Sequence, residues 1–216
     1  MPRTPPCSIA PYTTASLRRA VDTLCASDTA LAAAVKRFGH PPLWDREPGY
    51  ATLVHIILEQ QVSLASALAA LNKLKALVGT ITPQAVLSLS DAQLLAAGFS
   101  RQKTRYCRLL AEGMLSGAFD PVALARMSDD EARTSLMALT GIGVWSADIY
   151  LLMALCRADI WPRGDLALLI GAQEVLQLKQ RPDADAFAEL GERWRPHRSA
   201  AARILWHHYL GVRRRA

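Results

Sequence analysis

Cysteine is scarce in this sequence, and the spacing of the few that occur excludes a metal cluster. The 216 residues contain four cysteines, with no Cys-x-x-Cys pair and no Cys/His spacing typical of a ligand set. A structural zinc site and an iron–sulfur cluster both need such a set, so neither is expected. Isolated thiols are typical of a reducing compartment, and we expect a cytoplasmic protein of the bacterial cytosol or nucleoid. The cysteines are Cys7, Cys25, Cys107 and Cys156.

Long apolar runs and alternating strand patterns are also missing. The N-terminal MPRTPPCSIAPY has no apolar core of a signal peptide, and no uncharged run is long enough to span a bilayer. The absence of a phosphate-binding P-loop motif argues against a nucleotide-driven enzyme. Almost every segment has the helical period instead. The sequence therefore predicts an all-α fold of about ten helices, in one compact domain or two small lobes.

Positive charge is in excess, which suits a polyanionic partner. Lys and Arg number 25 against 19 Asp and Glu, giving a net charge of +6. Arg101, Lys103 and Arg105 lie in the first turn of an expected helix, where cations oppose the helix dipole. A DNA phosphate would offset that cost. We therefore take Arg101 and Lys103 as candidate DNA contacts, and a solvated basic face is the alternative.

Capping patterns predict where most helices begin. A Ser, Thr, Asp or Asn side chain satisfies free backbone N–H groups at a helix start, and a Gln or Glu three residues later completes a capping box. His207 and His208 have no acidic partner near them in the sequence, so we expect them at the surface or at an interface. The expected helix starts lie after Ser27, at about Gly49, after Ser63, at Pro83, and after Ser90, Ser100 and Ser128.

A glycine turn separates two of these helical stretches. The capping box from Ser128 to Glu131 opens a helix that runs through Leu136, and a second helical pattern begins at Val144. The segment LTGIG, residues 139–143, allows a tight turn between them. The N–H groups that open the second helix have no partner within it, and the helix dipole favours an anion there. The turn predicts a phosphate site that grips DNA without reading its sequence; a plain corner between helices is the alternative.

Asp165 is the second candidate for chemistry. It follows Trp161, Pro162, Arg163 and Gly164, and precedes an apolar run at residues 166–178 that predicts a helix. An aspartate in this position can simply cap the helix. A carboxylate beside a DNA sugar can instead stabilise positive charge that develops on the sugar.

The two features together resemble a known family. LTGIGVWSADIYLL followed by WPRGDLAL is similar to the helix-hairpin-helix plus Gly/Pro…Asp motif of the DNA glycosylase superfamily, and within it to the 3-methyladenine DNA glycosylase II branch. The resemblance implies that Asp165 is catalytic and that backbone amides of Gly141, Gly143 and Trp145 bind phosphate. It implies a compact form without the N-terminal β domain of longer relatives.

The resemblance also implies roles for residues outside the hairpin glycines. Bifunctional relatives carry a Schiff-base lysine where Trp145 stands, so a monofunctional enzyme that leaves an abasic site is expected. ILEQQVSLASA, residues 57–67, resembles the region facing DNA and makes Gln60, together with its neighbour Gln61, a candidate contact to DNA or the lesion, with helix-end polarity as the alternative. Trp145 and Trp206 would line the base pocket, although core packing is the alternative for Trp206. Phe99 is a candidate for the side chain that fills the gap left by the flipped base.

No cofactor is required for the expected reaction. The resemblance implies only that backbone carbonyls in the hairpin hold a structural Na⁺ or K⁺. These are the carbonyls of Met137, Leu139 and Ile142.

The expected architecture is two helical lobes with an active-site cleft between them. Residues 1–44 would form an N-terminal arm and helices that pack with the C-terminal lobe. Residues 45–165 would form the central lobe with the hairpin, and residues 166–216 would complete the second lobe.

The expected function is hydrolysis of the N-glycosidic bond of alkylated purines, of the 3-methyladenine and 7-methylguanine type, in base excision repair. The partner would be double-stranded DNA with a damaged base that is flipped out of the stack, and the protein would act as a monomer. Two alternatives stay open. One is a glycosylase for another lesion, such as uracil, hypoxanthine or an oxidised purine. The other is a non-catalytic helix-hairpin-helix protein that binds DNA damage.

Overall fold

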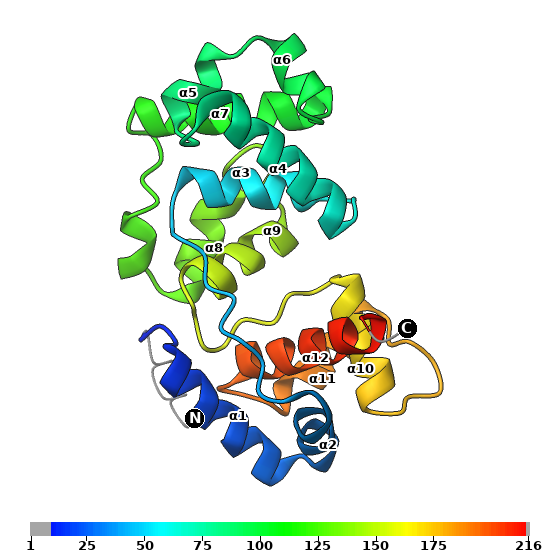
Figure 1. Cartoon of the computed structure of the whole chain (residues 1–216). Coiled ribbons are helices and arrows are strands. Elements are labelled where there is room, and N and C mark those ends of the chain that lie inside the picture. The colour runs from blue at the N-terminus through cyan, green and yellow to red at the C-terminus, as the bar shows by residue number, and fades with distance from the viewer. Residues whose placement is uncertain (1–9, 215–216) are drawn as a thin grey trace. The chain divides into compact units, whose positions relative to one another are not determined.

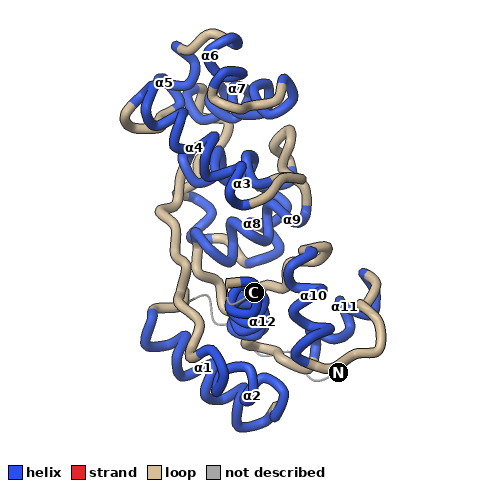
Figure 2. The backbone as a smooth tube through the Cα atoms, turned by 45° about the vertical axis from the view of Figure 1, so that its right-hand side comes forward, coloured by secondary structure: helices blue, strands red, loops and turns tan. Residues whose placement is uncertain are grey.

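The computed structural model describes residues 10–214, and within them every regular element is a helix (Figure 1). Figure 2 shows the helices joined by loops, with no strand in this part of the chain. The all-α prediction is therefore confirmed. The elements are α1 (Thr14–Ser27), α2 (Thr29–Phe38), α3 (Tyr50–Glu59), α4 (Leu64–Val78), α5 (Pro83–Ser88), α6 (Asp91–Ala96), α7 (Arg101–Leu115), η1 (Ala123–Arg126), α8 (Asp129–Met137), α9 (Val144–Ile149), η2 (Tyr150–Ala154), α10 (Leu166–Val175), α11 (Ala184–Glu192) and α12 (Arg198–Arg213).

The chain forms two compact units. One contains residues 46–150, and the other contains the described residues up to 45 together with those from 151 onward. The expected central lobe extended to residue 165, but the segment 151–165 makes its contacts in the second of these units. The Ile160 N–H donates to Ser199 Oγ at 2.9 Å, and Trp161 Nε1 donates to the Phe187 carbonyl at 2.8 Å. These bonds tie the approach to Asp165 to α11 and α12.

The unit of residues 46–150 is built around α3, which is buried on nearly every side. It packs against α4, α7 and α9. Glu59 at its C-terminal end is buried, and both carboxylate oxygens accept hydrogen bonds from Arg46, at 2.8 and 2.9 Å. The buried charge is therefore paired in a two-pronged geometry, which is the arrangement that a buried carboxylate needs.

The second unit is built around α12, which packs against α1, α2 and α10. Its first two turns are almost fully buried, including the polar side chains Ser199 and Arg203. Trp161 lies beside α11 in an aromatic cluster: its ring stacks on that of Phe187 with 4.5 Å between centroids, and its centroid lies 5.3 Å from that of Trp194. The cluster anchors the loop that leads to Asp165.

Most predicted helix starts are confirmed. Ser128 with Glu131 and Ser90 with Gln93 form the expected capping boxes, and Ser63 and Ser100 cap their helices as expected. The prediction for Ser27 is wrong, because α1 runs through it. Asp28 caps α2 instead, accepting from the N–H groups of Ala30 and Leu31 at 3.0 and 3.2 Å.

The prediction for His208 is also wrong. His208 is buried, and its Nε2 lies 3.2 Å from a carboxylate oxygen of Glu174 on α10. The His207 side chain is half-buried, and its Nε2 lies 2.9 Å from the Phe38 carbonyl oxygen. Both partners are distant in the sequence, so a local reading could not find them.

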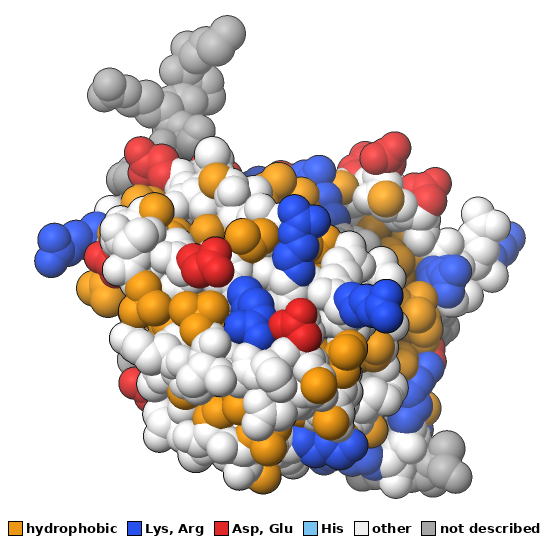
Figure 3. Space-filling model, turned by 90° about the horizontal axis from the view of Figure 1, so that it is seen from above, with side chains coloured by type: hydrophobic (Ala, Val, Ile, Leu, Met, Phe, Trp, Pro, Cys, Tyr) orange, Lys and Arg blue, Asp and Glu red, His pale blue; other side chains and the backbone are white. Residues whose placement is uncertain are grey.

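On the face shown in Figure 3, Lys and Arg side chains lie interspersed with acidic and apolar ones. This face has no continuous basic stripe. Among the described helices, none combines the length and the apolar character needed to cross a membrane.

Candidate functional site

The glycine turn joins α8 to α9 as a helix-hairpin-helix. The Ile142 N–H donates to the Leu139 carbonyl at 3.1 Å, and Gly141 takes a φ of +92° that favours glycine. Gly143 is the N-cap of α9, with extended backbone and no side-chain cap. The first N–H groups of α9 therefore receive no help from a capping side chain, which is the condition for binding an external anion.

Gly141 and Gly143 have different surroundings. A Cβ built on Gly141 would lie 2.3 Å from ring atoms of Tyr106, so the absence of a side chain lets α7 pack on the hairpin. A Cβ on Gly143 would meet nothing within 4 Å. The protein's own packing explains the first glycine and not the second.

Gln60 binds the hairpin from the end of α3. Its Nε2 donates to the Gly141 carbonyl at 2.8 Å and to Ser146 Oγ at 2.9 Å. The sequence predicted a DNA contact for Gln60, and the structure places its amide on the protein backbone of the glycine turn.

Lys103 is likewise engaged with backbone. Its Nζ donates to the carbonyls of Leu58 and Gln60, at 2.8 and 2.9 Å, and so closes the C-terminal end of α3. Burial lowers the pKa of this ammonium group. Arg101, two residues earlier on α7, is exposed and has no carboxylate partner in the part of the chain that the structure describes. Of the two predicted cations, Arg101 is the one presented to solvent.

The prediction for Phe99 is wrong, because the ring is only 3% exposed and cannot reach DNA. The sequence indicated Gln61 as a possible contact to DNA or the lesion, but not as the side chain that fills the gap. It is exposed and takes a left-handed φ of +56°, which is strained for a residue other than glycine. It lies between Gln60, which is bound to the hairpin, and Val62, which is 46% exposed. The sequence pattern treats Gln60 and Gln61 alike, and only the backbone geometry separates them.

Asp165 sits at the start of α10 with a fixed orientation. Its Oδ1 accepts from the Leu168 N–H at 2.9 Å and from Trp206 Nε1 at 3.0 Å. The carboxylate therefore does cap the helix. It is also half-buried and held by a second donor from α12, which a simple cap does not need.

The two predicted pocket tryptophans belong to different units. Trp145 lies in the first turn of α9 and is partly exposed. Trp206 lies on α12, is 7% exposed, and directs its indole N–H at Asp165.

The predicted cation ligands are chemically suited to a monovalent ion. Met137 ends α8, where helix carbonyls lack intrahelical partners, and the Leu139 and Ile142 carbonyls lie in the turn. Such neutral oxygen donors suit Na⁺ or K⁺. Within residues 10–214 no group of His, Cys, Asp and Glu side chains could form a transition-metal site.

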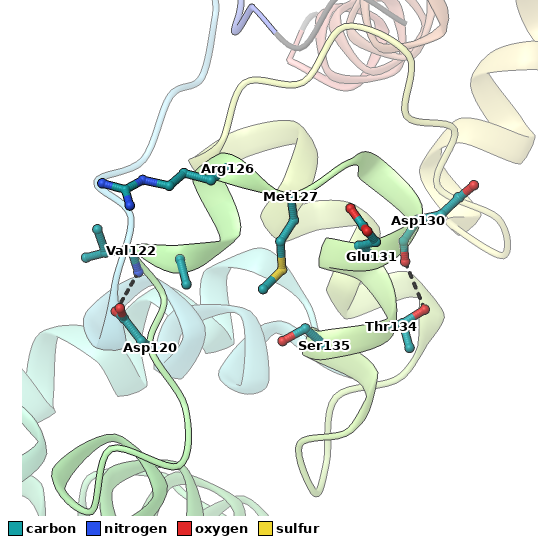
Figure 4. Close-up of a pocket in the computed structure, with 9 residues that line it drawn as sticks. Asp120, Val122, Arg126, Met127, Asp130, Glu131, Thr134 and Ser135 are labelled. Atoms are coloured by element: carbon teal, nitrogen blue, oxygen red, sulfur yellow. Dashed lines mark hydrogen bonds between the residues drawn. The ribbon is translucent and has the colours of Figure 1, made fainter. Parts of the chain in front are cut away.

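A pocket of about 940 Å³ lies elsewhere in the 46–150 unit, between η1 and α8 (Figure 4). None of the predicted site residues lines it. Its charged lining consists of Asp120, Asp130 and Glu131 against Arg126. This net negative charge repels a polyanion, so we do not assign DNA to it.

Comparison with known proteins identifies the family to which this segment is similar. The family model of the HhH-GPD superfamily base excision DNA repair proteins matches residues 54–196, a segment that contains Gln60, the hairpin and Asp165. DNA-3-methyladenine glycosylase 1 of Schizosaccharomyces pombe is 29% identical over 165 residues, covering 74% of this chain and 72% of the relative.

Two solved structures share the fold closely. A 3-methyladenine DNA glycosylase of Schizosaccharomyces pombe in complex with abasic DNA superposes with a TM-score of 0.82 at 28% identity, covering 87% of this chain and 95% of that one. A DNA-3-methyladenine glycosidase of Bacillus halodurans gives 0.73 at 28% identity, covering 90% and 91%. The family match, the helix-hairpin-helix and the aspartate that caps α10 agree, and the chain belongs to the HhH-GPD superfamily of base excision DNA repair proteins.

Proposed function

We propose that this protein is a monofunctional DNA glycosylase that removes alkylated purines of the 3-methyladenine and 7-methylguanine type. The observation that carries the proposal is the Asp165 carboxylate, held by N–H donors from α10 and α12. Relatives named for 3-methyladenine, at 28–29% identity, support the substrate class.

The chemistry follows from the substrate. Alkylation at a purine ring nitrogen makes the base cationic, so it leaves without much help from a general acid. As the bond from the base to C1′ breaks, positive charge develops on the sugar. A carboxylate beside it stabilises that charge by ~3 kcal/mol in a dry site and orients the attacking water. Water adds its oxygen to C1′ and gives up a proton, which passes by way of the carboxylate to solvent; an abasic site and the neutral free base remain. Because the target atom is inaccessible in a stacked duplex, the base must be flipped out first.

A strand-cleaving lyase activity is not expected. Such an enzyme forms a Schiff base between the sugar and an amine, and Trp145 has no amine. The Lys103 amine is committed to two carbonyls. We therefore expect an intact strand with an abasic site as the product.

The hairpin would hold the DNA backbone. The amides of Gly141, Gly143 and Trp145 are the proposed donors to phosphate, and the exposed Arg101 adds a positive charge. A Na⁺ or K⁺ on the carbonyls of Met137, Leu139 and Ile142 would add a positive charge next to the same phosphate.

The side chain that fills the gap left by the flipped base is, in this proposal, Gln61. The backbone of Gln61 is strained and its side chain is exposed. The neighbouring Gln60 is hydrogen-bonded to the hairpin at the Gly141 carbonyl. Trp145 is the proposed aromatic surface for the cationic base, through a cation–π attraction of ~1–2 kcal/mol.

The proposed partner is double-stranded DNA, with the protein acting as a monomer in the cytoplasm. Support for DNA comes from the relative bound to abasic DNA. Light scattering on the protein alone and with a duplex tests the monomer.

The state of the cysteines is compatible with a reducing compartment. The described cysteines are free thiols, and burial raises the pKa of Cys107 to about 12, which keeps it unreactive.

The decisive experiment compares wild type with Asp165→Asn on methylated genomic DNA, scoring released 3-methyladenine and 7-methylguanine. Asparagine caps a helix as well as aspartate does, so the fold is kept while the charge is lost. We expect release by wild type, a loss of about a hundredfold or more in the variant, and unchanged binding to a duplex with an abasic-site analogue.

Other outcomes point to the alternatives. Release of uracil, hypoxanthine or an oxidised purine from defined duplexes, without release of methylated bases, would replace the substrate class. Tight DNA binding with no base release from any of these duplexes would replace the enzyme with a damage-binding protein.

A further inference from the structure

We infer that Trp206 is a positioning residue for Asp165, acting through its indole N–H rather than as a surface on which the damaged base stacks. The inference rests on the proposed function and names how the catalytic carboxylate is oriented. It starts from the hydrogen bond of 3.0 Å between Trp206 Nε1 and Asp165 Oδ1.

One donor cannot fix a carboxylate. The Leu168 N–H at 2.9 Å holds Oδ1 at the helix start, but a single bond to that oxygen still permits the carboxylate to turn about it. A donor from a different element, arriving at the same oxygen, restricts that rotation. Because the reaction needs the carboxylate aimed at the sugar, a fixed plane lowers the cost of reaching the reactive geometry.

The donor itself is rigid. Trp206 is 7% exposed and belongs to the buried stretch of α12. A Cβ built on Gly171 of α10 would lie only 2.7 Å from the carbonyl oxygen of Leu205, the residue before Trp206. The absence of a side chain at Gly171 therefore lets the backbones of α10 and α12 come into direct contact. The helix that carries Asp165 and the helix that carries Trp206 are therefore locked together.

Burial also argues against stacking. A ring that is 7% exposed offers almost no face to a ligand, whereas Trp145 is partly exposed. An indole N–H can only donate, and the acceptor of the Trp206 N–H is the Asp165 carboxylate. A hydrogen bond to a charged acceptor is stronger than one between neutral groups.

The test separates the N–H from the ring. Trp206→Phe keeps an aromatic face and loses the N–H, and Trp206→Leu loses both. Replacement by β-(3-benzothienyl)alanine keeps the shape of the whole bicyclic ring and exchanges only the N–H for sulfur. Each protein is assayed under single-turnover conditions on duplex containing 7-methylguanine, together with its affinity for a duplex bearing an abasic-site analogue.

The positioning role predicts that the benzothienyl and Phe proteins both lose about tenfold in single-turnover rate, the effect of one hydrogen bond to a charged group. Their affinity for the abasic-analogue duplex stays within about twofold of wild type. A benzothienyl protein as fast as wild type, with Trp206→Leu impaired, would overturn the inference in favour of stacking.

A second measurement does not depend on turnover. In protein labelled with ¹⁵N-tryptophan, the Trp206 indole resonance should shift upfield in Asp165→Asn, because the charged acceptor is gone. An unchanged resonance would overturn the inference. Wild type that releases no base, together with a resonance that does shift, would refute the proposed function while leaving the contact established.

Discussion

At the scale of single residues, the two hairpin glycines are glycines for different reasons. At Gly141 the backbone has a positive φ, and a side chain would collide with the Tyr106 ring. Gly141→Ala should therefore lower the free energy of unfolding by about 2–3 kcal/mol, through strain and overpacking. Urea denaturation measures it, and a variant as stable as wild type would contradict this packing.

Gly143 predicts the opposite pattern. Its backbone is extended, nothing lies near its Cβ, and serine is a good N-cap, so Gly143→Ser should be as stable as wild type or slightly more stable. If a phosphate binds here, the new side chain occupies its place, and affinity for duplex DNA should fall about tenfold. Fluorescence anisotropy with a labelled duplex measures the loss. Unchanged affinity would mean that the turn is a corner between helices and no more.

At the scale of elements, the two cations in the first turn of α7 have different expected roles: Lys103 stabilises the fold, and Arg101 contributes to DNA binding. Lys103 closes the end of α3, so Lys103→Met should lower the free energy of unfolding by about 1–3 kcal/mol, because two carbonyls lose a charged donor. Arg101→Gln is the matched control at an exposed position. It should leave stability within about 0.5 kcal/mol of wild type and reduce the slope of log affinity against log salt by about one. A DNA-binding defect of Lys103→Met without a stability defect would reverse these assignments.

The same elements show why some features could be predicted from sequence and others could not. A capping box is closed within four residues, so Ser128 with Glu131 and Ser90 with Gln93 could be read from local spacing. Asp28 has the same kind of local role, but its Oδ2 also accepts from Trp194 Nε1 at 2.9 Å, across most of the chain. Nothing in the sequence around Asp28 indicates that partner.

The candidate site follows the same division. The hairpin and the aspartate were found because their residues lie in short, ordered motifs. The roles of Gln60 and Lys103 were not, because both reach backbone carbonyls that only the folded chain brings close. Polar side chains that the sequence leads one to expect at DNA can instead bond to the protein's own backbone, and residue type does not separate the two uses.

At the scale of the whole molecule, the histidines make stability fall in acid. Burial lowers the pKa of His55, His197 and His208 below the ordinary value of 6.5. Between each lowered pKa and 6.5 the unfolded chain binds protons that the folded chain does not, so stability should drop as the pH falls from 6.5. The slope is at most about 1.4 kcal/mol per pH unit for each proton.

Thermal unfolding at pH 7.5, 6.5 and 5.5 and constant ionic strength measures this loss. His208→Gln is the informative variant. Burial is the largest effect and lowers the His208 pKa, Arg37 and Arg213 lower it further, and together they outweigh Glu174, which raises it. The variant should show a shallower decline of Tm in acid than wild type. An equal decline would mean that His208 does not contribute to it.

The last feature of the whole molecule is Arg203, which is 0% exposed. Its guanidinium donates to the carbonyls of Leu43 and Leu152 at 2.8 Å each and to that of Ser199 at 3.2 Å, and burial lowers its pKa to about 10. Leu43 and Leu152 lie beside the points where the chain passes between its two compact units. The buried Arg203 side chain therefore hydrogen-bonds α12 to both connecting segments, at Leu43 and at Leu152.

Arg203→Met keeps the length of the side chain and leaves those carbonyls without a donor. It should lower the free energy of unfolding by about 3 kcal/mol, the cost of unpaired buried acceptors. Hydrogen–deuterium exchange should also rise in peptides covering residues 41–46 and 150–154, while the hairpin at residues 139–143 keeps its wild-type rate. Arg203→Lys restores the charge but not the reach to three carbonyls, so it should recover stability only in part. Wild-type exchange at both connections in Arg203→Met would show that the carbonyls are held by other means.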